Sequence, residues 1–449
     1  MRKEWLLLAA TVAVTLALAL GGIRLLAPQL LGGDVPVDRR VVRAAEEVPP
    51  FFDLVLNPAD LTPDRSLIND PYVGHRRAVM VPENAEFNAP FDLLGFRNRS
   101  VPVVADVVAL GDSQTVGTSA VFDQSWPRHL EQALAARQAS VYNMSVGGWG
   151  AVQYLYMFDK AALFRPRVVV VAFYTGNDPV DSLHLAYSFE PWKSLRGAPE
   201  KPKAAPLTWP PDPADTWAVR FADGMTTAFA ARTRLSANDR DYPGTLEGYR
   251  IMAEAARRID ARAAELGIAV IYTIIPTKEM AHAAKLRAEG IAPPPDFVRL
   301  VQHETQNIAE LSAELSALPH GRYVDVASLL QRAALGPAPL YPANENGHPL
   351  AAGYRVIALA LAPHVQAQLP PPLADGVALW ADPEHPGGGK VYLVRDGGAR
   401  LFNSQEVFLK NGWKWQPATF RPVTLRDLAA LRNLGLIETV DPAAYGPRP

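Results

Sequence analysis

The chain has 449 residues, 49% of them hydrophobic, which is enough for one large domain with smaller additions. A formal net charge of −2 and the lack of a long basic run argue against nucleic acid as a partner. The absence of cysteine excludes disulfides, thiolate catalysis and cysteine-ligated zinc sites.

An almost unbroken apolar run from Trp5 to Ile23 follows Arg2 and Lys3. Its length is about that of one bilayer-spanning helix, and the basic residues before it favour a cytoplasmic N-terminus. We therefore expect residues 1–26 to form a signal anchor or transmembrane helix, with the rest of the protein anchored outside the cytoplasm in the cell envelope. Ala17-Leu18-Ala19 is an acceptable cleavage site, and cleavage there would release a secreted protein.

Residues 27–97 are rich in proline and charge and show no sustained hydrophobic period. This composition predicts a stalk that becomes the lead-in to a folded domain.

The first clear strand is the β-branched run that begins at Val107, and it breaks off at Gly111, Asp112 and Ser113. Reacting groups in an open α/β sheet lie beyond the carboxyl ends of the strands, so Ser113 is a candidate nucleophile. Two alternatives compete. A phosphate-binding loop would need a lysine after its second glycine, Gly117, and none is present. A plain strand-to-helix turn would use Asp112 or Ser113 only as a helix cap.

Helical and strand patterns alternate through the next part of the chain. The apolar spacing predicts helices and buried strands in turn, with polar or glycine-rich loops after the strands. The helices are expected at 125–137, 151–164, 246–266, 295–318 and 351–369, and the strands at the start of 141–150 and at 168–173, 268–275 and 322–326.

Continuous apolar strands separated by helices require a parallel sheet that is covered on both faces. We therefore predict an α/β fold for residues 98–369, a three-layer α/β/α sandwich of flavodoxin-like type with about five parallel strands.

Residues 179–243 interrupt this regularity with aromatic residues scattered among prolines and charges. A connection this long in a compact domain is usually functional. The aromatic content favours a folded insertion or cap, and a packing insertion without contact to any site is the alternative.

Four polar blocks occur in order along the predicted domain, and together they resemble the SGNH/GDSL hydrolase superfamily. The first is Gly-Asp-Ser at the tip of the first strand, the second an Asn-x-x-x-x-Gly pattern, the third Gly-Asn-Asp, and the last a carboxylate three residues before a histidine. The residues that carry them are Ser113, Asn143 with Gly148, Gly176-Asn177-Asp178, and Glu345 with His348.

The resemblance implies a division of labour for ester chemistry. Ser113 would attack the carbonyl, and its backbone N–H would form an oxyanion hole with the Gly148 N–H and the Asn177 amide. His348 would be the base. Glu345 stands where the superfamily usually has aspartate, so it would orient the imidazole, or a backbone carbonyl would do so instead.

Other candidate groups are less convincing. His184 follows the third block, but no carboxylate lies at a matching offset, so an exposed loop histidine is the simpler interpretation. The sequence contains no His-Glu-x-x-His helix or comparable ligand cluster. The predicted chemistry therefore needs neither a metal nor another cofactor.

A triple proline within residues 368–373 predicts a linker, after which the composition changes. Residues 374–441 resemble a small module found repeatedly in secreted bacterial proteins, and we expect an α+β unit of short strands and turns, including 391–394 and 405–408, with a helix over 425–434. Trp413 and Trp415 would either pack in its core or form a carbohydrate platform.

The sequence thus favours a serine esterase that acts on a carbohydrate or lipid ester through an acyl-enzyme on Ser113. Two alternatives stay open: an O-acyltransferase that modifies an envelope polysaccharide, with a membrane acyl-donor protein as partner, and an inactive binding protein on a hydrolase scaffold.

Overall fold

The structure is a computed structural model of the chain. It describes residues 67–70, 72–77, 90–92, 94–102, 104–137, 139–207, 211–369, 375–381, 389–416, 419–423 and 431–447. The chain divides into two compact units, one of which spans Arg43–Leu373. The other contains Ala374–Pro449.

The larger unit is built on a five-stranded sheet with the strand order β4-β3-β5-β8-β9. Every neighbouring pair in this sheet is parallel. Strands β3, β4 and β5 are buried along their whole length, as the continuous apolar sequences of β3 and β5 predict. The parallel α/β sheet predicted from the sequence is therefore confirmed. The strands are β3 (Val107–Gly111), β4 (Val141–Ser145), β5 (Val168–Tyr174), β8 (Ala269–Ile275) and β9 (Arg322–Val324).

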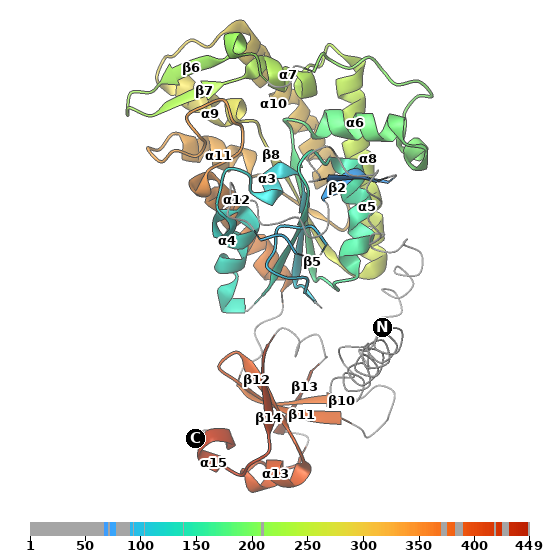
Figure 1. The fold of residues 1–449 in the computed structure, drawn as a ribbon, viewed down its shortest axis with the longest axis vertical. Coiled ribbons are helices and arrows are strands. Elements are labelled where there is room, and N and C mark those ends of the chain that lie inside the picture. Colours follow the sequence, from blue (N-terminus) through green and yellow to red (C-terminus); the bar gives the residue numbers. More distant parts are fainter. Residues whose placement is uncertain are drawn as a thin grey trace, which may run out of the picture. The chain divides into compact units, whose positions relative to one another are not determined.

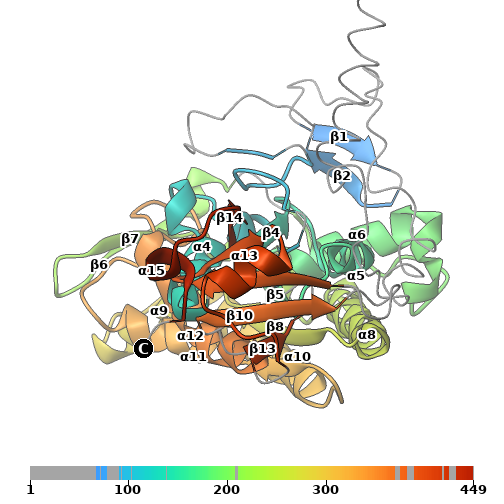
Figure 2. The same cartoon turned by 90° about the horizontal axis from the view of Figure 1, so that it is seen from below.

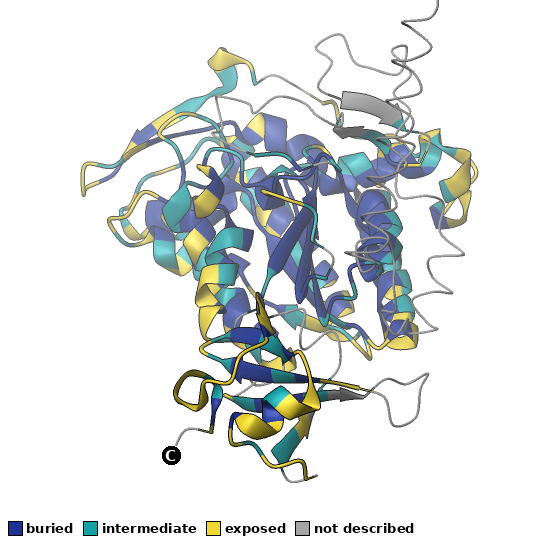
Figure 3. Cartoon of the chain, turned by 60° about the horizontal axis from the view of Figure 1, so that its bottom comes forward, coloured by how far each residue is buried: buried dark blue, intermediate teal, exposed yellow. Residues whose placement is uncertain are grey.

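Helices cover both faces of this sheet, and each face has its own apolar cluster (Figure 1). On one face lie α5 (Ala151–Ala162), α8 (Pro243–Leu266) and α10 (Pro295–Ser316). On the other lie α4 (Trp126–Ala133) and α12 (Ala351–Gln368). Figure 3 shows the strands buried between helices whose outer faces are exposed. The unit is a three-layer sandwich.

Several described helices of the larger unit were not expected from the sequence, among them α6 (Asp178–Ser188), α9 (Lys278–Ala288) and α11 (Ala327–Ala334). In α9 the buried positions include Lys278, Glu279 and Lys285. Buried charges disguise the apolar stripe on which helix prediction depends.

The insertion at 179–243 is folded. It contains most of α6, a 3-10 segment η5 (Glu190–Leu195), the hairpin β6 (Trp217–Arg220) with β7 (Thr226–Phe229), and α7 (Ala231–Asn238). Trp217 packs edge-on against Phe297 at 5.4 Å between ring centroids. At least one aromatic side chain of the insertion, Trp217, therefore packs against the rest of the unit.

Part of the predicted stalk also belongs to the folded unit. Strands β1 (Leu67–Asp70) and β2 (Gly74–Arg77) form an antiparallel hairpin beside α5 (Figure 2). Val73 in its turn and Phe96 in the lead-in are buried in the same cluster as α5 and α8. The fold thus begins N-terminal to residue 98.

No helix among the described residues has the length and apolar character needed to cross a bilayer. The predicted anchor at 1–26 lies outside the described residues, so the expectation of a membrane helix stays a prediction.

The second unit contains a mixed sheet with the order β13-β10-β11-β12-β14. Its described helices are α13 (Gln405–Lys410) and α15 (Pro442–Tyr445), so residues 405–408 are helical and not extended as predicted. The helix predicted at 425–434 is wrong at its C-terminal end, because 432–434 belong to strand β14, which pairs with β12. Residues 424–430 are not described. The strands are β10 (Gly376–Ala381), β11 (Gly389–Arg395), β12 (Gly398–Phe402), β13 (Phe420–Pro422) and β14 (Arg432–Ile437).

Trp413 and Trp415 both contact the buried ring of Phe408, with centroid distances of 6.2 Å and 5.5 Å. Trp413 also donates a hydrogen bond to the Tyr445 carbonyl at 2.7 Å. Trp413 therefore has the contacts of a core residue, whereas Trp415 is 48% exposed despite its contact with Phe408.

Candidate active site

Three neighbouring strands end at one edge of the sheet. Gly111 of β3 is in register with Ser145 of β4 and Ala172 of β5. Because parallel strands have their carboxyl ends at the same edge, the loops that follow them meet there. Ser113, Gly148 and Asn177, the residues of the first three blocks, lie in these loops.

The turn that presents Ser113 is held from both sides. Asp112 accepts a hydrogen bond from the Gln114 N–H at 2.9 Å, so it does cap the short helix α3 (Ser113–Val116). Arg97, buried in the lead-in, donates to the carbonyls of Val116 and Gly117 at 2.9 Å and 2.7 Å. The capping alternative is thus correct for Asp112, and it leaves the Ser113 hydroxyl free for another contact.

Ser113 and His348 form the central pair of the site. The hydroxyl oxygen of Ser113 lies 2.8 Å from Nε2 of His348, although 235 residues separate them in the sequence. A longer contact of 3.3 Å joins the same hydroxyl to Asp112. Both Ser113 and His348 are only partly buried, whereas Asp112 and Gln114 are fully enclosed. The structure thus brings together the serine and the histidine that were predicted from the sequence as nucleophile and base.

The partner of the other imidazole nitrogen differs from the prediction. Nδ1 of His348 lies 2.7 Å from Oδ1 of Asn346, and not against Glu345. The same Asn346 oxygen accepts the backbone N–H of His348 at 3.0 Å, a turn that brings the amide to the ring. The Glu345 carboxylate instead interacts with the Lys278 ammonium. The predicted contact of Glu345 with the imidazole is therefore corrected to Asn346.

These contacts define the tautomer of His348. Because Oδ1 of Asn346 accepts the backbone N–H, the amide nitrogen faces away, and it donates to the Ser119 hydroxyl at 2.9 Å. Nδ1 must then carry the imidazole hydrogen, since an amide oxygen only accepts. The lone pair of Nε2 consequently points at the Ser113 hydroxyl, as a general base requires.

The environment keeps His348 neutral. Burial lowers the pKa of His348 to about 3, and the nearby Arg234 guanidinium acts in the same direction. Arg234 comes from α7, so the insertion does reach the turn that carries the histidine. A side chain at Gly347 would come within 2.9 Å of the guanidinium, and glycine leaves the space for it.

A buried lysine anchors the loop that leads to His348. Nζ of Lys278 donates to the carbonyls of Pro342 and Asn344 at 2.7 Å and 2.5 Å. Burial lowers the pKa of Lys278 to about 8, and the carboxylates of Glu279 and Glu345 oppose this shift. No sequence pattern pointed to this lysine, because a helical lysine is normally solvent-exposed.

The three predicted oxyanion donors, which are the N–H groups of Ser113 and Gly148 and the amide of Asn177, lie in loops at the same edge of the sheet. Within the described residues, neither the Ser113 N–H nor the Gly148 N–H donates a hydrogen bond, so both can donate to a ligand. The Asn177 amide donates to Asp181 at 2.7 Å and lies 3.4 Å from Asp178. Both contacts are to acidic side chains, so the Asn177 amide would have to release the longer one to donate to a ligand.

Acidic groups are enclosed next to these donors. Burial raises the pKa of Asp112 and of Asp181 to about 7 each, and it raises that of Asp178 well above its usual value. Asp178 is fixed by the Tyr174 N–H and the Tyr154 hydroxyl at 2.9 Å and 3.0 Å. Strongly shifted pKa values of this kind are typical of functional sites.

The remaining histidine of interest, His184, is exposed on α6 and lies 3.4 Å from the Ser188 hydroxyl. This is the exposed position that the sequence favoured.

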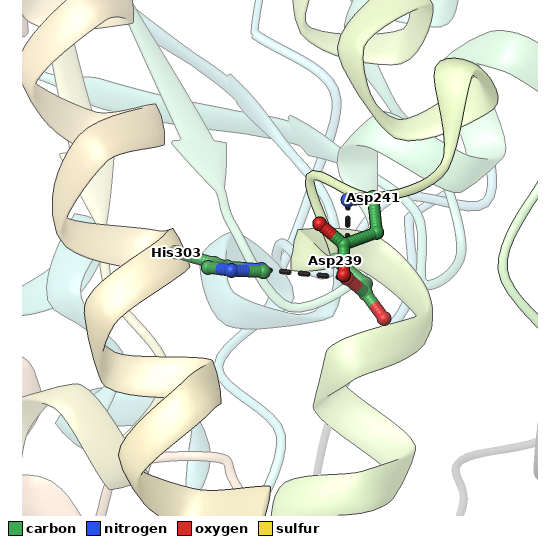
Figure 4. A group of neighbouring side chains, drawn as sticks. All are labelled: Asp239, Asp241 and His303. Atoms are coloured by element: carbon green, nitrogen blue, oxygen red, sulfur yellow. Dashed lines mark hydrogen bonds and ion pairs between the residues drawn. The ribbon is translucent and has the colours of Figure 1, made fainter.

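One group of described side chains has the spacing of a metal site: Asp239, Asp241 and His303 (Figure 4). Arg299 already donates to both carboxylates, at 2.8 Å and 2.6 Å. Nδ1 of His303 accepts the Arg240 backbone N–H at 3.1 Å. With a guanidinium between its carboxylates, the group fits an ion-pair cluster and not a cation site.

Searches of solved structures give 31 matching chains. They include a GDSL-like lipase from Bacteroides thetaiotaomicron (12% identity, 59% of this chain and 88% of that one, TM-score 0.32). Another is a putative SGNH hydrolase from Slackia heliotrinireducens (19%, 58% and 98%, TM-score 0.30). A third is a catalytic mutant of an acetylxylan esterase from Geobacillus stearothermophilus (11%, 59% and 95%, TM-score 0.32). No curated protein matches the chain.

The model of the GDSL-like lipase/acylhydrolase family matches residues 109–356. This range is more than half of the 449 residues and contains the sheet, the Ser113–His348 pair and the three donor loops. The chain therefore belongs to the GDSL-like lipase/acylhydrolase family and is an enzyme of the serine esterase type.

Proposed function

We propose that the enzyme hydrolyses a carbohydrate or lipid ester through an acyl-enzyme on Ser113. The observation that carries this proposal is the 2.8 Å contact between the Ser113 hydroxyl and Nε2 of His348, whose Nδ1 is held by Asn346. Nucleophile, base and orienting group are thus within hydrogen-bonding distance in the order that acyl transfer needs.

In the first half of the reaction, Oγ of Ser113 forms a bond to the ester carbonyl carbon while its proton passes to Nε2 of His348. The carbonyl oxygen becomes an oxyanion, which the N–H groups of Ser113 and Gly148 and the amide of Asn177 stabilise. The tetrahedral intermediate then collapses, His348 returns the proton to the leaving alcohol, and the acyl-enzyme remains.

In the second half, water gives its proton to His348 and attacks the acyl-enzyme, which releases the acid and restores Ser113. Exposure of Gly148 and partial exposure of Ser113, Asn177 and His348 support access of water. An O-acyltransferase would share the acyl-enzyme and differ only in the acceptor. Mass spectrometry of products, with a chromogenic acetyl donor and envelope oligosaccharides present, distinguishes free acetate from acetylated sugar.

The test of the nucleophile is covalent labelling of the full chain. A fluorophosphonate should modify the wild-type protein at Ser113, and Ser113→Ala should abolish both labelling and ester hydrolysis while thermal unfolding stays unchanged. A matched control is Ser188→Ala, on the exposed end of α6. Undiminished labelling of folded Ser113→Ala would overturn the proposal, because another residue would then be the nucleophile. A wild-type protein that is neither labelled nor active on any ester would support an idle binding protein.

We also propose that the enzyme is anchored in the cell envelope through the apolar run that begins at Trp5. A reporter enzyme that works only after export should be active when it is fused behind Leu369. Activity of a cytoplasm-specific reporter at the same position would refute this location.

A further inference from the structure

A histidine outside the four blocks touches the loop that follows β4. Nε2 of His75, in strand β2, lies 2.9 Å from the carbonyl oxygen of Gly147. A carbonyl oxygen only accepts, so Nε2 carries the hydrogen and donates it. His75 precedes the residues that match the family, which begin at residue 109. The contact is therefore contributed by the lead-in of this chain.

The peptide group that His75 contacts is the one that carries the Gly148 N–H. In a trans peptide the C=O and N–H point in opposite directions, so a donor that fixes the Gly147 oxygen also fixes the Gly148 hydrogen. The two glycines show where this peptide lies. A Cβ at Gly148 would be 3.5 Å from the His75 ring. A Cβ at Gly147 would be 3.6 Å from the Cβ atom of Ser113.

Several contacts hold His75 in place. Its own carbonyl accepts the indole N–H of Trp149 at 2.8 Å, and the Val73 carbonyl accepts from Gln153 at 3.3 Å. Tyr72 stacks on Tyr156 of α5 at 5.3 Å between ring centroids. The hairpin turn is thus docked on the helix that follows the glycine loop, which makes the His75 donor preorganised.

We propose that His75 is a positioning residue for the oxyanion hole: it holds the Gly147–Gly148 peptide so that the Gly148 N–H faces the reacting carbonyl. Gly148 is exposed and lacks a side chain, and a glycine with φ 76° has no intrinsic reason to keep one peptide orientation. A hydrogen bond to the carbonyl also polarises the amide, which strengthens donation by its N–H. The inference rests on the proposed function of Ser113 and Gly148.

The experiment compares three His75 variants of the full chain on a neutral chromogenic ester. His75→Leu and His75→Ala remove the donor and should lower kcat by about 10- to 100-fold, somewhat less than the loss of an oxyanion donor itself. KM should change less than about threefold, because the oxyanion develops during the reaction and is absent from the bound substrate. His75→Gln keeps an N–H donor and should recover most of kcat. His184→Ala, an exposed histidine of α6, is the matched control.

Each outcome separates this inference from the proposed function. If Ser113→Ala is inactive while His75→Leu and His75→Ala keep wild-type kcat, the positioning role is refuted and the nucleophile stands. If Ser113→Ala is active, the proposed function fails first. If both donor-free variants unfold, the comparison of His75→Gln with the wild type decides. A folded Gln variant with wild-type KM and a kcat near that of the wild type supports the positioning role. A folded Gln variant with a raised KM and an unchanged kcat refutes it.

Discussion

A neutral amide takes the place that a carboxylate usually has beside the base. Asn346 can fix the tautomer of His348, since its oxygen accepts both the backbone N–H and the Nδ1–H. It cannot offset the positive charge that His348 gains during acyl transfer, as an aspartate would. The orienting role and the charge-stabilising role are therefore separated at this residue.

Exchange of the two neighbouring residues tests this arrangement. Asn346→Ala should lower kcat by about 100-fold or more, because the imidazole loses its fixed tautomer, with little change in KM. Glu345→Gln should change kcat by less than about threefold, since Asn346 and not Glu345 contacts Nδ1 of His348, and the Glu345 charge acts on Lys278. Steady-state kinetics on one ester give both values. A large loss of kcat in Glu345→Gln with Asn346→Ala unaffected would restore the carboxylate as the orienting group.

The lowered pKa of His348 predicts the pH dependence. The base works when neutral, and its pKa of about 3 means that activity persists below the range where an ordinary histidine becomes protonated. Measured on the free enzyme, the acid limb of kcat/KM should lie well below pH 6.5. Asn346→Asp places a negative charge at Nδ1, which favours the imidazolium and should move this limb to higher pH. A wild-type limb near pH 6.5 to 7 would contradict the role of burial.

The sequence predicted which residues carry the reaction better than it predicted which residues contact them. Ser113 and His348 could be found because each belongs to a block with a fixed place at a strand end or helix start. Asn346 was missed because the resemblance directs attention three residues before the histidine, whereas the amide reaches the ring through a turn of two residues. His75 carried no signal at all, since its function depends on a long-range contact across the fold.

Among the elements, the packing of α8 against α6 decides where Asn177 lies. Gly248 of α8 faces the start of α6, and a Cβ there would be 2.3 Å from the Pro179 carbonyl oxygen. Only glycine allows this approach of two backbones. Helix α6 begins one residue after Asn177, so a shift of its first turn would move the amide.

Gly248→Ala should therefore destabilise the fold by about 1 to 3 kcal/mol through overpacking, despite the better helix propensity of alanine. The kcat should fall as well, because a displacement of about 1 Å at a reacting group is costly. Denaturant unfolding and kinetics measure the two effects. Leu246→Ala is the control, since this side chain on the same helix is 41% exposed. A Gly248→Ala variant as stable and active as the wild type would show that the two helices can separate freely.

The succession of strands and main helices along the chain could be predicted, because long apolar runs and a 3.6-residue period are local properties of the sequence. The order of the strands within the sheet was not predicted. The prediction failed for elements whose stability depends on contacts with neighbouring segments. Helix α9 buries Lys278 and Lys285, and only the carbonyl and carboxylate partners supplied by other segments make this favourable. The end of the predicted C-terminal helix became β14 because pairing with β12 outweighs local propensity.

For the whole molecule, the apolar clusters indicate how many cooperative parts the chain has. Four clusters of described residues draw only on the larger unit, from Val73 to Leu369, and a fifth draws only on the C-terminal unit, from Val377 to Ile437. Each unit thus has a core of its own, which is the property of an independently folding domain. The sequence predicted this division from the proline-rich stretch and the change of composition.

Removal of the C-terminal unit is the corresponding test. A chain that ends at Leu373 should keep kcat/KM on a small soluble ester within about twofold, because every group of the candidate site belongs to the larger unit. Scanning calorimetry of the full chain should show a transition that is absent from the shortened one. A cooperative unfolding transition of the shortened chain is the control that shows that it is folded. A loss of activity of about tenfold or more in such a chain would mean that the C-terminal unit takes part in catalysis.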